Sequence, residues 1–137
     1  RGNAGQAVRA SAAIPNVFQP AVIGGRRYVD GGLVQPVPVT AARQQGANFV
    51  IAVDISAKPE NAPDKSFFSY LDQTLNIMNT AALNSELGKA DVVIKPRVQN
   101  FGAVGGFDQK AQAIKTGEAA ARAALPEIKR KLAAYRY

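Results

Sequence analysis

Asp30 is the residue whose type and position are best suited to chemistry. It ends an extended stretch, and two glycines, Gly31 and Gly32, follow it directly. Ligand and catalytic sites of open α/β sheets gather at strand ends, and glycines there allow a close backbone approach or a positive φ. A carboxylate held in such a place can act as a general base. However, Asp-Gly is also a common turn dipeptide in which the aspartate bonds its own backbone, and the tripeptide alone favours that plain turn.

The composition restricts the groups with which Asp30 could work. The 137 residues contain no cysteine and no histidine. Thiolate chemistry, a complete Ser-His-Asp triad and a histidine-ligated zinc site are therefore excluded within this sequence. We predict no metal and no cofactor, because the glycine-rich loop 102–106 has no lysine or Ser/Thr at phosphate-loop spacing. No serine has glycines at both flanking positions, and the serines are Ser11, Ser56, Ser66, Ser69 and Ser85.

The elements around Asp30 are predicted from capping and turn residues. Asn3 is suited to cap a short helix over residues 4–13. A hairpin or tight loop is expected between Val22 and Tyr28, because Gly24 and Gly25 form a turn signal. The apolar residues beside Asp30 are expected to surround the carboxylate and make it a better base, and they are Tyr28, Val29, Leu33 and Val34.

The rest of the chain alternates helices and strands. A helix over 39–45 precedes the apolar run 49–53, which predicts a strand buried on both faces. A long helix over 67–87 should bury one apolar face, made of Phe67, Leu71, Leu75, Met78, Ala82 and Leu87. A second strand over 91–94 leads to a helix that Asp108 should cap and that should reach about residue 124, with a kink or a new start at Pro126. This order predicts an α/β sandwich with a mainly parallel sheet.

Several segments together resemble the patatin-like phospholipases, most closely the bacterial members. They are ASAAIPNVFQP at 10–20, GRRYVDGGLV at 25–34, PVPV at 36–39 and GANFVIAVD at 46–54, with DVVIKP at 91–96 resembling a later strand. The resemblance implies a three-layer α/β/α sandwich and a serine–aspartate dyad acting on lipid or other ester bonds. It makes Asp30 the catalytic aspartate and Gly31 and Gly32 its structural neighbours.

In that family the nucleophilic serine lies in a Gly-x-Ser-x-Gly elbow, and a glycine-rich loop forms the oxyanion hole. Both lie N-terminal to the segment that corresponds to Asp30-Gly31-Gly32, and neither is in this sequence. We therefore expect residues 1–137 to be the C-terminal part of one patatin-like domain, inactive alone and prone to self-association. The alternative is a non-catalytic or degenerate patatin-like binding or scaffold domain. The compartment is not indicated, although a cytoplasmic or membrane-associated protein fits the resemblance.

Two further polar features have less weight. Asp54 ends the strand 49–53, but an aspartate that caps the next turn explains it better, and Ser11 is better explained by helix packing. The formal charge of +7 suits anionic partners, yet no aromatic residues are interleaved with the cations, so no nucleic acid is expected. The cluster Lys129-Arg130-Lys131 is interpreted as a solvated helix face with a Glu127–Lys131 pair, and contact with an anionic membrane surface is its alternative.

Overall fold

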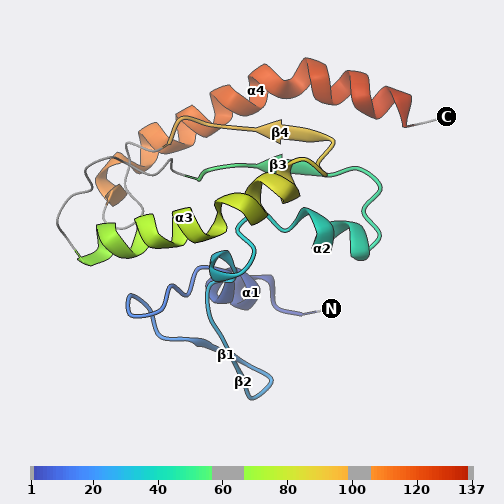
Figure 1. Cartoon of the computed structure of the whole chain (residues 1–137). Coiled ribbons are helices and arrows are strands. Elements are labelled where there is room, and N and C mark those ends of the chain that lie inside the picture. Colours follow the sequence, from blue (N-terminus) through green and yellow to red (C-terminus); the bar gives the residue numbers. More distant parts are fainter. Residues whose placement is uncertain (1, 57–66, 99–105, 136–137) are drawn as a thin grey trace. The chain divides into compact units, whose positions relative to one another are not determined.

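The computed structural model describes residues 2–56, 67–98 and 106–135. The chain divides into two compact units, Arg1–Pro36 and Val37–Tyr137. The first unit contains the segment Asp30-Gly31-Gly32. The second unit contains the two parallel strands and the helices that pack with them (Figure 1).

In the first unit, a short helix precedes a hairpin. Helix α1 (Ala4–Ser11) begins as predicted, because Oδ1 of Asn3 accepts a hydrogen bond from the backbone nitrogen of Gln6 at 3.2 Å. Strands β1 (Ala21–Ile23) and β2 (Arg26–Tyr28) pair antiparallel, which confirms the hairpin. Gly24 and Gly25 connect them with φ of 57° and 76°, values that glycine adopts readily and that suit the twist of a two-residue hairpin turn.

The second unit begins with helix α2 (Val39–Gln44), which ends as predicted at Gly46. Gly46 has φ of 94°, its nitrogen donates to the carbonyl of Arg43 at 2.9 Å, and the nitrogen of Ala47 donates to the carbonyl of Ala42 at 3.1 Å. These two bonds form the Schellman pattern that stops a helix. The chain then enters strand β3 (Ile51–Val53).

Strand β3 pairs in parallel with β4 (Val92–Ile94), in a register that places Ala52 beside Val93. Helix α3 (Phe67–Leu87) connects the two strands, and helix α4 (Lys110–Ala134) follows the short 3-10 helix η3 (Gly106–Gln109). In this unit strands alternate with helices and pair in parallel, so the predicted α/β class is confirmed.

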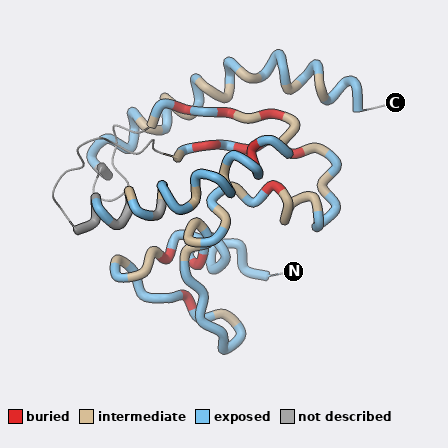
Figure 2. Tube along the Cα trace, in the orientation of Figure 1, coloured by how far each residue is buried: buried red, intermediate tan, exposed pale blue. Residues whose placement is uncertain are grey.

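The core of the second unit lies between the strands and the helices α2 and α3. The buried cluster consists of Val39, Val50, Ala52 and Leu87, and Leu83 and Val93 pack against it. Helix α4 packs on β4, whose Val92 and Ile94 are buried. Figure 2 shows these buried positions concentrated along the two strands. The two strands therefore lie between α4 on one side and α2 with α3 on the other.

Two predictions of burial were wrong. Ile51 and Val53 remain 42% and 52% exposed, so β3 is not buried on both faces. The described residues give β3 one neighbouring strand, and α4 packs on β4, so this apolar side of β3 is only partly covered. On α3, Met78 and Ala82 are exposed although Leu87 is buried. The described core contacts of α3 come from its last turns, and the side chains of Phe67, Leu71 and Leu75 lie outside the described residues.

Two predictions about the last helix were also wrong. Asp108 lies inside η3 and does not cap α4, which begins after Gln109. The helix does not end near residue 124 or start again at Pro126 but continues to Ala134, and a kink at the proline stays a prediction. The segment before the proline is rich in alanine, the strongest helix former, which favours continuation. Among the described helices, none is both long enough and apolar enough to cross a bilayer.

Candidate active site

Asp30 lies two residues beyond the end of β2 and is half-buried. Its backbone nitrogen donates to the carbonyl of Ala13 at 3.0 Å. This bond joins the aspartate to the segment after α1, and Ala13 itself is buried. The position of Asp30 in the first unit is therefore fixed by backbone pairing from both the hairpin and the segment after α1.

The carboxylate of Asp30 forms the turn that its sequence predicted. Oδ1 accepts a hydrogen bond of 2.7 Å from the backbone nitrogen of Gly32, and Asp30 thereby caps the 3-10 helix η1 (Gly31–Leu33). A Cβ atom at Gly32 would lie 3.0 Å from this same oxygen, whereas one at Gly31 would meet nothing within 4 Å. Gly32 is thus required for close approach, and neither glycine has a positive φ. The turn orients the carboxylate through the hydrogen bond to Oδ1.

Most of the apolar residues predicted to surround Asp30 are exposed. Tyr28 and Val29 are each 43% exposed and Val34 is 81% exposed, while Leu33 is half-buried. Three of the four apolar neighbours are therefore exposed, although Asp30 itself is half-buried. The reason is local geometry, since an extended strand followed by a turn directs successive side chains away from one another.

Asp54 is placed by its contacts as a structural residue, as its turn interpretation predicted. It is 6% exposed, and its Oδ1 accepts hydrogen bonds from the nitrogen of Ser56 at 3.0 Å and from Oγ of Ser56 at 2.6 Å. Nζ of Lys95 lies 2.9 Å from its Oδ2. Burial acts to raise the pKa of Asp54, but the bonds from Ser56 and Lys95 outweigh it and hold the pKa below its ordinary value. A carboxylate with a lowered pKa is a weak base.

Ser11 and Ser56 are both described, and neither is flanked by the glycines of a nucleophile elbow. Ser11 is exposed at the last residue of α1, and the hydroxyl of Ser56 binds Asp54. Ser66 and the side chain of Ser69 lie outside the described residues, as does most of the loop 102–106. In the described part of the chain, no group of three or more acidic side chains could hold a metal ion.

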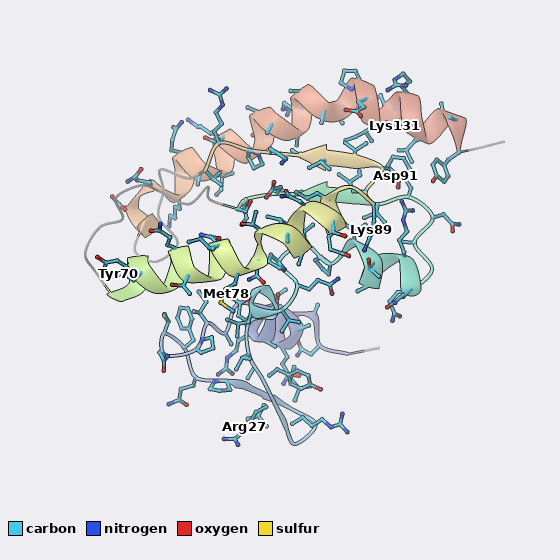
Figure 3. All side chains as sticks on the ribbon, in the orientation of Figure 1. Arg27, Tyr70, Met78, Lys89, Asp91 and Lys131 are labelled. Atoms are coloured by element: carbon cyan, nitrogen blue, oxygen red, sulfur yellow. The ribbon has the colours of Figure 1, made fainter. Side chains whose placement is uncertain are left out.

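The cationic cluster on α4 is partly structural. Lys131 pairs with Glu127 at 2.9 Å, which confirms the predicted i,i+4 pair, and its Nζ also donates to the carbonyl of Asp91 at 2.6 Å. Figure 3 shows Lys131 on α4 beside Asp91 at the start of β4. One of the three cations therefore fastens the helix to the strand.

Two polar clusters that hold the second unit together were not predicted from the sequence. In one, Glu86 on α3 accepts from the nitrogen and hydroxyl of Thr40, both at 2.6 Å, and pairs with Lys89. In the other, Oδ2 of Asp91 binds Arg43 at 2.6 Å and the nitrogen of Val50 at 2.7 Å. The partners are more than 40 residues apart in sequence, except for Lys89 and Glu86, so no local pattern could reveal them.

Comparison with known proteins finds similarity to one family over the first part of the chain. Residues 2–43, which include Asp30, match the family model of the patatin-like phospholipases. The resemblance to the patatin-like phospholipases is thus confirmed for this part of the chain, while the particular similarity to bacterial members and the role of Asp30-Gly31-Gly32 stay predictions.

Individual relatives come from both yeasts and mycobacteria. The chain is 32% identical over 56 residues to the lysophospholipase NTE1 of Debaryomyces hansenii, with 41% of this chain and 4% of the relative aligned. It is 39% identical over 56 residues to an uncharacterized NTE family protein of Mycobacterium bovis, with 41% of this chain and 16% of the relative aligned. The lysophospholipase NTE1 of Kluyveromyces lactis is 36% identical over 62 residues, or 45% of this chain and 4% of the relative. The chain therefore spans a small part of the length of these curated relatives.

Proposed function

We propose that Asp30 is the carboxylate of a serine–aspartate dyad in a lipid acyl hydrolase, a phospholipase or esterase. We further propose that residues 1–137 form the C-terminal part of its catalytic domain. The main support is that the match to the patatin-like phospholipases includes Asp30. The serine would lie upstream, because this sequence contains no Gly-x-Ser-x-Gly elbow. The substrate class is a lipid or another ester, and the chain alone is expected to be inactive.

In this mechanism the carboxylate of Asp30 accepts the proton of the serine hydroxyl while the serine oxygen attacks the ester carbonyl. The proton then passes to the leaving alcohol, and an acyl-serine remains. Water attacks the acyl-serine, Asp30 accepts the water proton, and the proton returns to the serine oxygen as the fatty acid leaves. The hydrogen bond from Gly32 to Oδ1 supports this role, because it fixes the orientation of the carboxylate.

The test is Asp30→Asn in the full-length protein, with hydrolysis of a p-nitrophenyl ester as the readout. Asparagine keeps an oxygen that can accept from Gly32, so the turn should survive while the base is lost. The rate should fall about 10²- to 10⁴-fold. Asp108→Asn, at an exposed position in η3, makes the same change elsewhere and should keep the wild-type rate.

Other results would favour the alternative, a non-catalytic or degenerate patatin-like domain. If Asp30→Asn kept the wild-type rate, Asp30 would not be the base. If the full-length protein lacked an upstream serine elbow and hydrolysed no ester, the binding or scaffold interpretation would replace the enzyme. Turnover by pure residues 1–137 would contradict the division of the dyad between this chain and the upstream part.

A further inference from the structure

A cleft of about 530 Å³ opens between the segment after β4 and the first half of α4. Its polar lining comes from these two elements, and it consists of Lys95, Arg97, Gln112, Lys115 and Thr116, with two alanines of α4 completing the wall. The volume lies within the range of about 300–1,000 Å³ that is typical of small-molecule sites. The cleft begins just beyond the carboxyl end of β4, and ligands of open α/β sheets bind beyond the carboxyl ends of the strands.

The charge of the cleft is positive. Three of its lining side chains are cations, and no carboxylate is among them. Lys95 is paired with the buried Asp54, which is itself held by Ser56. Arg97 and Lys115 are exposed, and within the described residues neither one forms an ion pair. Two cations from different elements therefore line the cleft without a described carboxylate to neutralise them.

We propose that this cleft binds a phosphate group, as a phosphomonoester carried by a small molecule or by a lipid headgroup. The guanidinium of Arg97 can donate two parallel hydrogen bonds to phosphate oxygens, and Lys115 adds a compact charge. The amide of Gln112 supplies a further donor. Thr116 donates its hydroxyl proton to the carbonyl of Gln112 at 2.9 Å, so its oxygen is left to accept from a protonated phosphate.

Lys95 has a structural role, unlike the other two cations of the cleft. Its ammonium group is within 2.9 Å of Asp54, so its charge is largely used to compensate a buried carboxylate. Removal of Lys95 would leave Asp54 without its cation and would destabilise the second unit. Arg97 and Lys115 are therefore the residues whose substitution tests binding without disturbing the fold.

The experiment measures binding of inorganic phosphate and of glycerol 3-phosphate to the intact protein by titration calorimetry. Arg97→Gln and Lys115→Gln should each weaken saturable binding about tenfold, because each removes a charge-assisted contact. Lys129→Gln removes the same charge from an exposed position of α4 outside the cleft and should keep the wild-type affinity. Thermal unfolding of all three variants checks that the fold is intact.

A second arm distinguishes the two sources of the phosphate. Vesicles of phosphatidylcholine with phosphatidic acid are compared with vesicles carrying phosphatidylserine at the same surface charge. If Arg97→Gln weakens binding to phosphatidic acid selectively, the phosphate belongs to a lipid headgroup. If it weakens binding of glycerol 3-phosphate alone, the ligand is a soluble phosphomonoester. The proposal is overturned if the wild-type protein shows no saturable binding, or if Lys129→Gln weakens binding as much as the two cleft variants do.

Discussion

Oδ1 of Asp30 lies 2.7 Å from the backbone nitrogen of Gly32, and a Cβ atom at Gly32 would lie 3.0 Å from that same oxygen. The hydrogen bond and the close approach are two parts of one arrangement. A side chain at position 32 would have to displace the carboxylate that caps η1. The turn thus makes the orientation of Asp30 depend on the absence of a side chain two residues later.

Gly32→Ala in the full-length protein should therefore move the Asp30 carboxylate and lower ester hydrolysis by at least about tenfold, because small misplacements of a catalytic group are costly. Gly31→Ala is the matched control, since the same methyl group there meets nothing within 4 Å. Its effect on the hydrolysis rate should be clearly smaller. Equal losses for the two variants would mean that the turn tolerates neither methyl group for reasons unrelated to the carboxylate.

Glu86 should make the second unit sensitive to acid. Hydrogen bonds from Lys89 and from Thr40 lower the pKa of Glu86 from 4.5 to about 2. Because the folded chain binds this proton less readily than the unfolded chain, the stabilisation is complete above about pH 4.5 and is lost as the pH falls toward 2. The free energy of unfolding, measured with urea, should decrease across this window in the wild-type chain and decrease less in Glu86→Gln.

Glu118 provides the control for that substitution. It is exposed on α4 and pairs with Arg122 at 2.7 Å in an i,i+4 arrangement. Exposed pairs of this kind contribute little, so Glu118→Gln should change the free energy of unfolding at neutral pH by less than about 0.5 kcal/mol. A Glu86→Gln chain whose stability fell with acid as steeply as the wild type would contradict the role given to Glu86.

Asp91 should be a strong determinant of stability. Its Oδ2 accepts from Arg43 and from the nitrogen of Val50, and its Oδ1 accepts from the hydroxyl of Tyr135 at 3.2 Å. Asp91→Ala leaves these donors without their acceptor and should lower the free energy of unfolding by about 2 kcal/mol or more. Thermal or urea unfolding at neutral pH provides the measurement.

Tyr135→Phe separates the weakest of these bonds from the rest. It removes the hydroxyl but keeps the ring, whose centroid is 5.4 Å from that of Phe49 in an edge-on contact. The cost should stay below about 1 kcal/mol, because the bond is long and exposed. If this variant were as unstable as Asp91→Ala, the main contribution would come from Tyr135 and not from Arg43 and Val50.

The exposed apolar side of β3 should promote self-association of residues 1–137. Ile51, Val53 and Ile55 are all exposed, and β3 pairs with β4 along one edge only among the described strands. Such an edge can accept another strand. Sedimentation should show concentration-dependent association that Val53→Lys weakens, while Val22→Lys, at an exposed valine of the hairpin, leaves it unchanged. A strictly monomeric wild-type chain would contradict this prediction.

Local signals in the sequence determined the elements whose ends depend on one or two residues. Asn3 predicted the start of α1, Gly24-Gly25 predicted the hairpin, and Gly46 predicted the end of α2, because each of these features needs a particular side chain or a positive φ. The sequence also singled out Asp30 and the turn that it makes. These interactions span at most a few residues, so composition and spacing are enough to reveal them.

Local signals do not reveal which side chains are buried or which distant groups meet. An apolar run predicts a strand but not its cover, so the exposure of Ile51 and Val53 depends on where α4 packs. Asp91 and Arg43 lie 48 residues apart in sequence, and their contact also depends on the packing of whole elements. The cleft lined by Arg97 and Lys115 depends on that packing as well. Burial and long-range pairing depend on how whole elements pack, and that information is not contained in any local segment.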